Sequence, residues 1–138
     1  MSNIYTTLGL QRVINGSGRM TYLGVSTFSA GVAQAFLSAS QNYVIVDDLL
    51  NILGQKISQF TGGEDTCITA SASAGIVLSV AGIIARDDLV LIENLPHVMG
   101  KNQIILPKGH AIHYGAPIAT MVGLGGGQLV EAGQANMV

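Results

Sequence analysis

Two stretches in the first half of the chain carry apolar side chains at helical spacing. The first starts after Ser29, a typical N-cap residue, and is expected to run to about Ser40. The second has Asp47 or Asp48 near its start and is expected to run to about Phe60, with glycine at 62–63 to end it. The apolar faces consist of Val32, Ala33, Phe36 and Leu37 in the first, and Leu49, Leu50, Ile52, Leu53 and Ile57 in the second.

Residues 65–85 predict a strand, a turn and a helix in direct succession. The residues around Cys67 are expected to form a short buried strand, followed by a turn of small residues from Ala70 to Gly75. The helix that begins in this turn is expected to end near Ala85. Its apolar residues occur on all sides, which predicts burial all round: Ile76, Val77, Leu78, Val80, Ala81, Ile83 and Ile84.

The second half alternates short apolar runs with a short helical stretch. Strands are predicted at Leu89–Ile92, Gln103–Leu106 and Gln128–Ala132, and a helix at about Pro117–Val122. Strands that alternate with helices favour an open, largely parallel α/β sheet. No internal repeat or linker is evident, so residues 1–138 are interpreted as one domain or part of one.

The five residues before the last predicted strand, 123–127, include four glycines and superficially match a dinucleotide-binding fingerprint. That fingerprint requires a strand before the glycines and a helix after them, whereas here a strand follows. The run is therefore interpreted as a helix exit and a turn.

The composition narrows the function classes. Only 10% of the residues are charged and the mean hydropathy is positive, so either another chain covers much of the surface or the chain is the core-rich part of something larger. A net charge of −2 with six scattered basic residues offers no stripe for DNA. The lone Cys67 is expected to be a small core residue in a reducing compartment.

The N-terminal residues show no secretory signal pattern, so a cytoplasmic protein is expected. Thr66–Ala85 contains no charge and is long enough to span a bilayer. Its first half is mostly Thr, Ser and Ala, however, and strand-to-helix chemistry explains it better.

The turn at Ala70–Gly75 is a candidate phosphate site. The first N–H groups of a helix are unpaired and carry about half a positive charge, and the turn has almost no side-chain bulk. Ser71 and Ser73 could cap the helix or donate to the same anion, and the alternative is an ordinary cap. Lys108 and His110 follow the strand at 103–106, where α/β sheets bind ligands. A phosphate site together with a histidine that could stack on a ring suggests pyridoxal phosphate.

Four segments, taken together and in order, resemble a known family. They are residues 15–21 (NGSGRMT), 69–75 (TASASAG), 106–110 (LPKGH) and 125–136 (GGGQLVEAGQAN). With them the chain resembles the N-terminal third of the selenocysteine-synthase-like pyridoxal-phosphate-dependent enzymes. Within that family it is most similar to the D-glucosaminate-6-phosphate ammonia-lyase branch.

The resemblance implies the N-terminal part of the large domain of a fold-type-I, aminotransferase-like enzyme, working as a homo-oligomer. The expected cofactor is pyridoxal 5'-phosphate, and the expected substrate is a phosphorylated amino acid or amino sugar acid. The cofactor phosphate would be held around Ser71, Ala72, Ser73 and Ala74, and His110 would stack on the pyridine ring. Arg19 and Thr21 would face a substrate anion or a neighbouring subunit's cofactor phosphate, and Lys108 would touch a phosphate or a carboxylate.

The catalytic group of the family is not expected within this chain. The resemblance places the Schiff-base lysine, and the aspartate opposite the pyridine nitrogen, beyond residue 138. The lysines present are Lys56, Lys101 and Lys108, and none has that family context. The chain by itself is therefore expected to be inactive.

Two other functions stay open alongside the lyase. One is selenium transfer onto seryl-tRNA, for which no basic surface is evident; the other is a non-catalytic remnant or interaction module. A metal site is not expected, because His110 and His113 have no third ligand type nearby. Asp47-Asp48 and Asp87-Asp88 are interpreted as helix-end and loop charges, and Glu131 as a solvated strand end.

Overall fold

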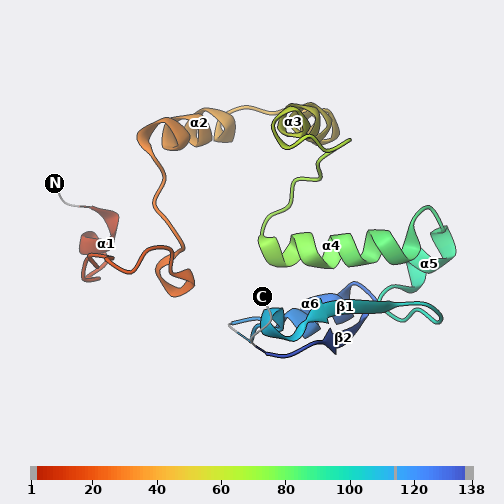
Figure 1. Ribbon diagram of the computed structural model, residues 1–138. Coiled ribbons are helices and arrows are strands. Elements are labelled where there is room, and N and C mark those ends of the chain that lie inside the picture. The colour runs from red at the N-terminus through yellow and green to blue at the C-terminus, as the bar shows by residue number, and fades with distance from the viewer. Residues whose placement is uncertain (1–2, 114, 136–138) are drawn as a thin grey trace. The chain divides into compact units, whose positions relative to one another are not determined.

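The computed structural model describes residues 3–113 and 115–135. They divide into two compact units, Met1–Ile45 and Val46–Val138 (Figure 1). The last residue of the fourth sequence motif, Asn136, lies outside the described residues.

The first unit consists of short helices joined by extended segments. Helix α1 spans Ile4–Thr7, the 3-10 turn η1 spans Thr21–Leu23, and α2 spans Ala30–Ser40. The Ser29 side chain caps α2 by accepting a hydrogen bond from the N–H of Val32 at 3.4 Å. The sequence prediction for this helix is therefore confirmed at both ends.

The glycine-rich segment before η1 is a turn, as its composition predicts. The Asn15 side chain accepts a hydrogen bond from the Ser17 N–H at 2.9 Å and donates one to the Gly18 carbonyl. Met20 then forms an antiparallel bridge to Val25, a β-branched residue held at a φ of 68°. A positive φ is strained for such a residue, so the bridge fixes the shape of this loop at the expense of local backbone strain at Val25.

Helix α3, Val46–Thr61, opens the second unit and carries Asp47 and Asp48 in its first turn. It ends at Gly62, which has a φ of 76°. Its start, its acidic first turn and its glycine stop agree with the prediction. The segment that follows returns close to the helix: a Cβ added to Gly54 would lie 2.7 Å from the carbonyl oxygen of Thr66.

Residues 66–69 form no strand in the described structure, contrary to the prediction. A strand needs a partner for its backbone hydrogen bonds, and the sheet of the described residues contains only two strands, both later in the chain. Cys67 in this segment is exposed, so its assignment to the core is also wrong for this structure.

Helix α4 spans Ala72–Ala85 and α5 spans Leu89–Asn94. The strand predicted at Leu89–Ile92 is wrong, because Asp88 caps a helix there: its carboxylate accepts from the N–H groups of Val90 at 2.9 Å and Leu91 at 3.2 Å. A run of four apolar residues does not distinguish a strand from a helix, and the cap decides the outcome here.

The sheet consists of two parallel strands, β1 (Gln103–Pro107) and β2 (Gln128–Ala132), with Ile104 opposite Leu129 and Ile105 opposite Val130. The 3-10 turn η2, Lys108–His110, follows β1 directly, and α6 (Ile118–Leu124) connects back to β2. Both strands, the α6 helix and the glycine turn after it agree with the predictions. The described architecture is thus α/β with a small parallel sheet.

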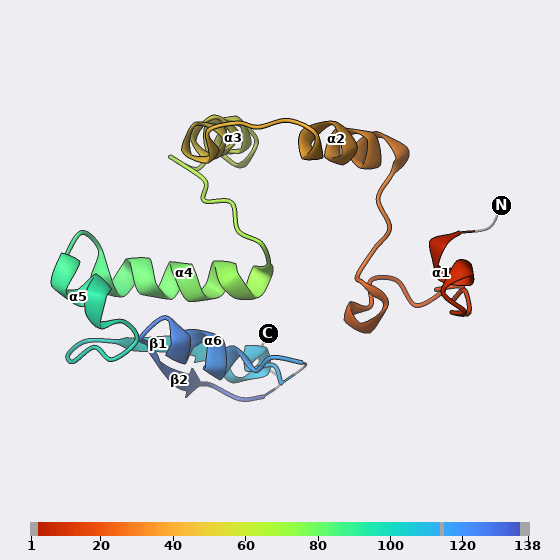
Figure 2. The same ribbon diagram turned by 180° about the vertical axis from the view of Figure 1, so that it is seen from behind.

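The core of the second unit lies where α4, α6 and the sheet meet, and α4 and α6 lie side by side in opposite views (Figures 1 and 2). Its buried apolar residues are Val80, Ala85, Met121 and Val122. Glycine at 125–127 allows this close approach: a Cβ on Gly125 would lie 2.8 Å from Val80 Cβ, and one on Gly127 would lie 2.9 Å from Ile104 Cγ1.

Much apolar surface stays uncovered. Leu78 on α4 is 53% exposed and Ile83 is 66% exposed, so the prediction that this helix is buried on all sides does not hold for the described structure. Within the described residues, none of the helices has the length and apolar content needed to cross a membrane.

Candidate functional site

The first turn of α4 is shaped by Ser71 and Thr69. The Ser71 hydroxyl accepts a hydrogen bond from the N–H of Ala74 at 3.1 Å, the geometry of a helix N-cap. The Thr69 hydroxyl donates to the Ser71 carbonyl oxygen at 2.9 Å, which holds the backbone just before the helix. The same carbonyl accepts from the N–H of Gly75 at 3.0 Å, the first backbone hydrogen bond of the helix.

This arrangement leaves several donors at the helix start. Within the described residues, the N–H groups of Ala72 and Ser73 have no hydrogen-bond acceptor. The Ser71 hydroxyl accepts from Ala74 but keeps its own proton for donation, and the Ser73 hydroxyl is also available as a donor. Ser71 and Ala72 are exposed and Ser73 is half-buried. These donors, with no bulky side chain beside them in the sequence, fit an oxyanion such as a phosphate.

Lys108 and His110 lie where the sequence places them, at the carboxyl end of the sheet. Pro107 at the end of β1 is opposite Ala132 at the end of β2, and η2 begins at the next residue. Both side chains are exposed, and Glu131 on β2 is exposed too. The η2 turn is closed by the Ala111 N–H, which donates to the Lys108 carbonyl at 3.2 Å.

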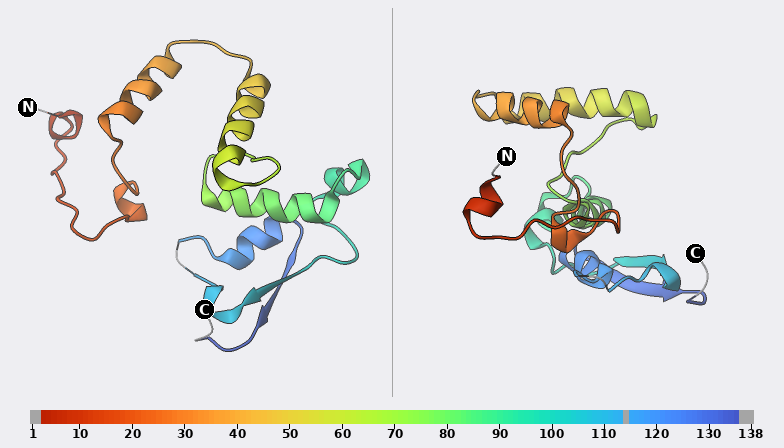
Figure 3. Two further views of the ribbon diagram at one scale, coloured as in Figure 1. Left: turned by 45° about the horizontal axis from the view of Figure 1, so that its top comes forward. Right: turned by 90° about the vertical axis from the view of Figure 1, so that its left-hand side faces the viewer.

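The helix start and the η2 turn lie toward the same side of the second unit. Helix α4 runs in the direction opposite to β1, so its first turn is toward the end at which β1 finishes (Figure 3). No hydrogen bond or ring contact joins His110 to the first turn of α4 in the described part of the chain. The described residues also contain no group of three or more His, Cys, Asp or Glu arranged to hold a metal, and His113 is exposed.

Arg19 and Thr21 belong to the first unit. Arg19 is exposed beside the Met20–Val25 bridge, and Thr21 is the exposed first residue of η1. Their assignment to a substrate anion or to a neighbouring subunit's cofactor phosphate stays a prediction.

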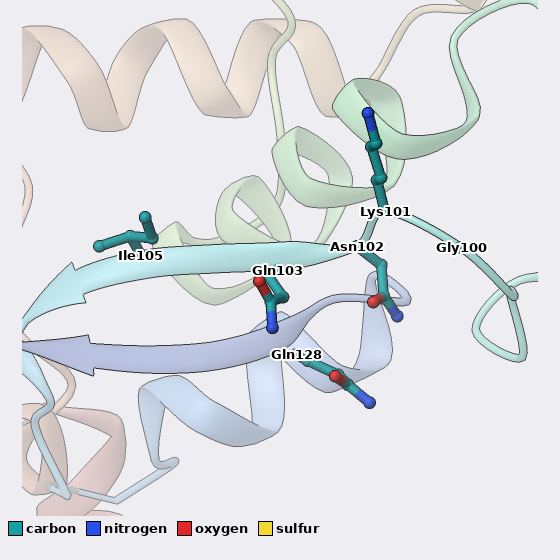
Figure 4. Close-up of a pocket in the computed structure, with 6 residues that line it drawn as sticks. All are labelled: Gly100, Lys101, Asn102, Gln103, Ile105 and Gln128. Carbon is teal, nitrogen blue, oxygen red and sulfur yellow. The ribbon is translucent and has the colours of Figure 1, made fainter.

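The structure shows one hollow that sequence reasoning missed, at the amino ends of the strands. It is open to solvent, has a volume of about 500 Å³ and is lined by Gly100, Lys101, Asn102, Gln103, Ile105 and Gln128 (Figure 4). The Asn102 side-chain amide donates to the Gly126 carbonyl at 2.9 Å, and the Asn102 backbone carbonyl accepts from the Gln128 N–H at 2.8 Å. Because Gln103 and Gln128 come from strands distant in the sequence, only the parallel register could have placed them together.

No family model matches the chain. It is 42% identical over 136 residues to D-glucosaminate-6-phosphate ammonia lyase of Salmonella typhimurium (strain 14028s / SGSC 2262), which covers 98% of this chain and 37% of that protein. It is 38% identical over 134 residues to 5'-C-glycyluridine monooxygenase-decarboxylase of a Streptomyces species, covering 96% of this chain and 34% of that protein. A solved structure of D-glucosaminate-6-phosphate ammonia-lyase matches 99% of this chain and 37% of its own, with a TM-score of 0.92 and 42% identity.

These similarities extend along almost the whole chain, whereas the chain spans little more than a third of either relative's length. The candidate phosphate site, the η2 turn and the glycine-rich turn all fall within the matched part, because that part leaves out only about 2% of the chain. The chain is therefore similar, in sequence and in fold, to one segment of an ammonia lyase.

Proposed function

We propose that the chain forms the phosphate-binding segment of a pyridoxal-phosphate-dependent ammonia lyase that acts on an amino sugar acid phosphate such as D-glucosaminate 6-phosphate. The observation that carries the proposal is the pair of unpaired N–H groups on Ala72 and Ser73, inside a segment 42% identical to such a lyase. In this proposal residues 1–138 are the N-terminal segment and the first part of a fold-type-I large domain in a cytoplasmic homo-oligomer.

The residues of α4 would bind the cofactor through its phosphate. The N–H groups of Ala72 and Ser73 donate to phosphate oxygens, and the hydroxyls of Ser71 and Ser73 add two more donors. Ala74 acts indirectly, since its N–H is already bonded to Ser71 and holds that hydroxyl in place. The helix dipole favours the negative charge of the phosphate at this end.

His110 and Lys108 would serve the ring and the substrate. The imidazole of His110 stacks on the pyridine ring and fixes its tilt, while Lys108 pairs with a phosphate or carboxylate of the substrate. When bound, pyridoxal phosphate would supply an electron sink for loss of the proton on the amine-bearing carbon. The hydroxyl of the neighbouring carbon would leave as water, and hydrolysis of the unsaturated amine by one water would then give ammonia and a 2-keto product. Arg19 and Thr21 would bind the substrate anion or a neighbouring subunit's cofactor phosphate.

The test is a chimera in which these 138 residues replace the matched segment of the Salmonella relative. We expect the chimera to release ammonia from D-glucosaminate 6-phosphate and the 138-residue chain alone to release none. A chimera that folds and binds pyridoxal phosphate but releases no ammonia would contradict the proposed substrate.

A second candidate is supported by the similarity to the Streptomyces relative. That relative contains a similar segment, 38% identical over 96% of this chain, and its name refers to 5'-C-glycyluridine. The chimera should therefore also be offered that nucleoside amino acid. Turnover of 5'-C-glycyluridine in preference to the sugar acid would favour this second candidate.

A further inference from the structure

The turn at residues 15–18 contains an asparagine followed directly by a glycine, a pair that occurs once in the sequence. Asn15 and Gly16 are both exposed. Apart from its chain neighbours, no described atom lies within 4 Å of a Cβ added to Gly16. The side-chain carboxamide of Asn15 and the backbone nitrogen of Gly16 are therefore both accessible to water.

Two hydrogen bonds hold the Asn15 carboxamide in this turn. Its Oδ1 accepts from the Ser17 N–H at 2.9 Å, and its Nδ2 donates to the Gly18 carbonyl. The N–H of Ser17 polarises the carboxamide, because it would stabilise the negative charge that develops on Oδ1 when a nucleophile attacks Cγ.

The nearest backbone nucleophile is the nitrogen of the next residue, Gly16. Within the residues that the structure describes, the Gly16 N–H has no hydrogen-bond acceptor, so hydroxide can remove its proton. Gly16 also has no side chain to hinder closure of a ring between its nitrogen and Cγ of Asn15. Attack within the chain needs no second molecule to be brought into place, which favours it over direct attack by water.

We propose that Asn15 is a site of spontaneous deamidation in the folded chain, with water as the co-reactant. The Gly16 nitrogen loses its proton to hydroxide and forms a bond to Cγ of Asn15. The bond from Cγ to Nδ2 breaks, and that nitrogen takes a proton from water and leaves as ammonia, which restores the hydroxide. One water then opens the five-membered imide. Its attack on Cγ gives aspartate, and its attack on the backbone carbonyl carbon gives isoaspartate.

The modification would change the turn that carries it. Both products lack the Nδ2 group that donates to the Gly18 carbonyl, and both add one negative charge next to a loop that contains Arg19. Isoaspartate also lengthens the main chain by one methylene group. These changes involve the loop alone, so they are independent of the proposed cofactor and substrate.

The test follows the 138-residue chain at mildly alkaline pH, in native buffer and in denaturant. Peptide mapping by mass spectrometry measures conversion of each carboxamide to a carboxylate. Asn42 is the internal control, since it is exposed and its side chain donates to the Ser38 carbonyl at 2.7 Å, but Tyr43 follows it. In native buffer we expect Asn15 to convert at least about tenfold faster than Asn42, because Gly16 leaves ring closure unhindered.

Gly16→Ala is the matched variant. The added methyl group lies in open space, and the φ of Gly16 is outside the left-handed region, so the turn should keep its shape. We expect conversion at position 15 to slow about tenfold in this variant. Enzymatic methylation specific for isoaspartate should label the unchanged chain more strongly than the variant. Conversion of Asn15 no faster than that of Asn42, conversion confined to denaturant, or an unchanged rate in Gly16→Ala would each overturn the proposal.

Discussion

The hydroxyl oxygens of Ser58 and Thr66 lie 3.0 Å apart and join the last turn of α3 to the segment that leads into α4. Ser58 is buried, with 8% of its surface exposed. The approach is possible because Gly54, one turn earlier on the same side of the helix, has no side chain to hold the segment away. A serine and a glycine four residues apart thus position the residues that precede the proposed phosphate site.

Replacement of Gly54 by Ala should loosen α3. The added Cβ would lie 2.7 Å from the Thr66 carbonyl oxygen, a backbone atom that cannot move without the whole segment. We expect a loss of about 1–3 kcal/mol of local stability, measured by amide hydrogen exchange within α3. The control is Gly82→Ala on α4, where, apart from the adjoining residues and backbone of the same helix, no described atom lies within 4 Å of the new Cβ. That variant should gain roughly 0.5–1 kcal/mol of protection in α4, and equal effects at both sites would contradict the steric argument.

Substitutions at Ser71 separate helix capping from phosphate binding. Ser71→Asp keeps a cap acceptor for the Ala74 N–H but places negative charge beside the proposed phosphate. In the lyase chimera we expect the affinity for pyridoxal phosphate to fall about tenfold or more, with no loss of α4 protection in hydrogen exchange.

Ser71→Ala should lower both the affinity of the chimera for pyridoxal phosphate and the stability of α4. The loss of helix stability should be about 1 kcal/mol. The matched control is Ser29→Asp at the cap of α2, which should leave cofactor affinity unchanged. If Ser71→Asp binds pyridoxal phosphate as tightly as the unchanged chimera, Ser71 caps the helix and does not bind the phosphate.

His110 should be replaceable by another flat ring. If its function is to stack, His110→Phe will retain most of the pyridoxal phosphate affinity of the chimera and His110→Ala will lower it by about tenfold, since a stacked ring pair contributes roughly 0.5–1.5 kcal/mol beyond its buried area. His113→Ala, three residues later and also exposed, serves as the control. Equal affinity in His110→Phe and His110→Ala, both reduced, would point to a hydrogen bond from the imidazole rather than stacking.

Helix α5 should depend on a single carboxylate. Asp88 accepts two backbone hydrogen bonds at the helix start, so Asp88→Ala should cost about 1 kcal/mol and expose the amides of α5 to exchange. Asp87→Ala, one residue earlier and outside this cap, should leave exchange in α5 unchanged. An unchanged α5 in Asp88→Ala would show that packing on α4, rather than the cap, determines the helix.

The 138-residue chain alone should not unfold as a single cooperative unit. Many of its large apolar side chains are more than half exposed, among them Ile83 and Ile105, and the sheet has two strands only. We expect dye binding typical of exposed apolar surface and association that grows with concentration, measured by fluorescence and light scattering. A sharp thermal transition of a monomer would contradict this expectation.

Local chemistry made most elements predictable from the sequence. Some signals depend on neighbouring residues alone. They include Ser29 as a helix cap, Gly62 as a helix stop and the short apolar runs in the strands at 103–107 and 128–132. The turn of small residues and the Ser71 cap at the start of α4 were predictable for the same reason, whereas phosphate binding at this turn stays a prediction. Asp88 was an available cap signal as well, but the apolar run after it favoured a strand.

What could not be predicted depends on partners distant in the sequence. Whether residues 66–69 pair as a strand, and whether Leu78 and Ile83 are buried, is decided by polypeptide that must lie beside them. Whether Arg19 and Thr21 lie next to a ligand depends in the same way on what the first unit packs against. Sequence patterns indicate that such residues are suited to burial or to binding, but they do not identify the group that each residue contacts.

The glycine-rich turn before β2 has a consequence for how this segment can vary. A methyl group at position 125, 126 or 127 would come within about 3 Å of neighbouring atoms on α4, β1 or the loop near Leu95. Every single-base change of a glycine codon that alters the residue, other than to a stop, adds at least a Cβ. In a saturation library selected for folded protein, these three positions should stay nearly invariant, while Gly16 and Gly31, with open space around them, accept substitution freely.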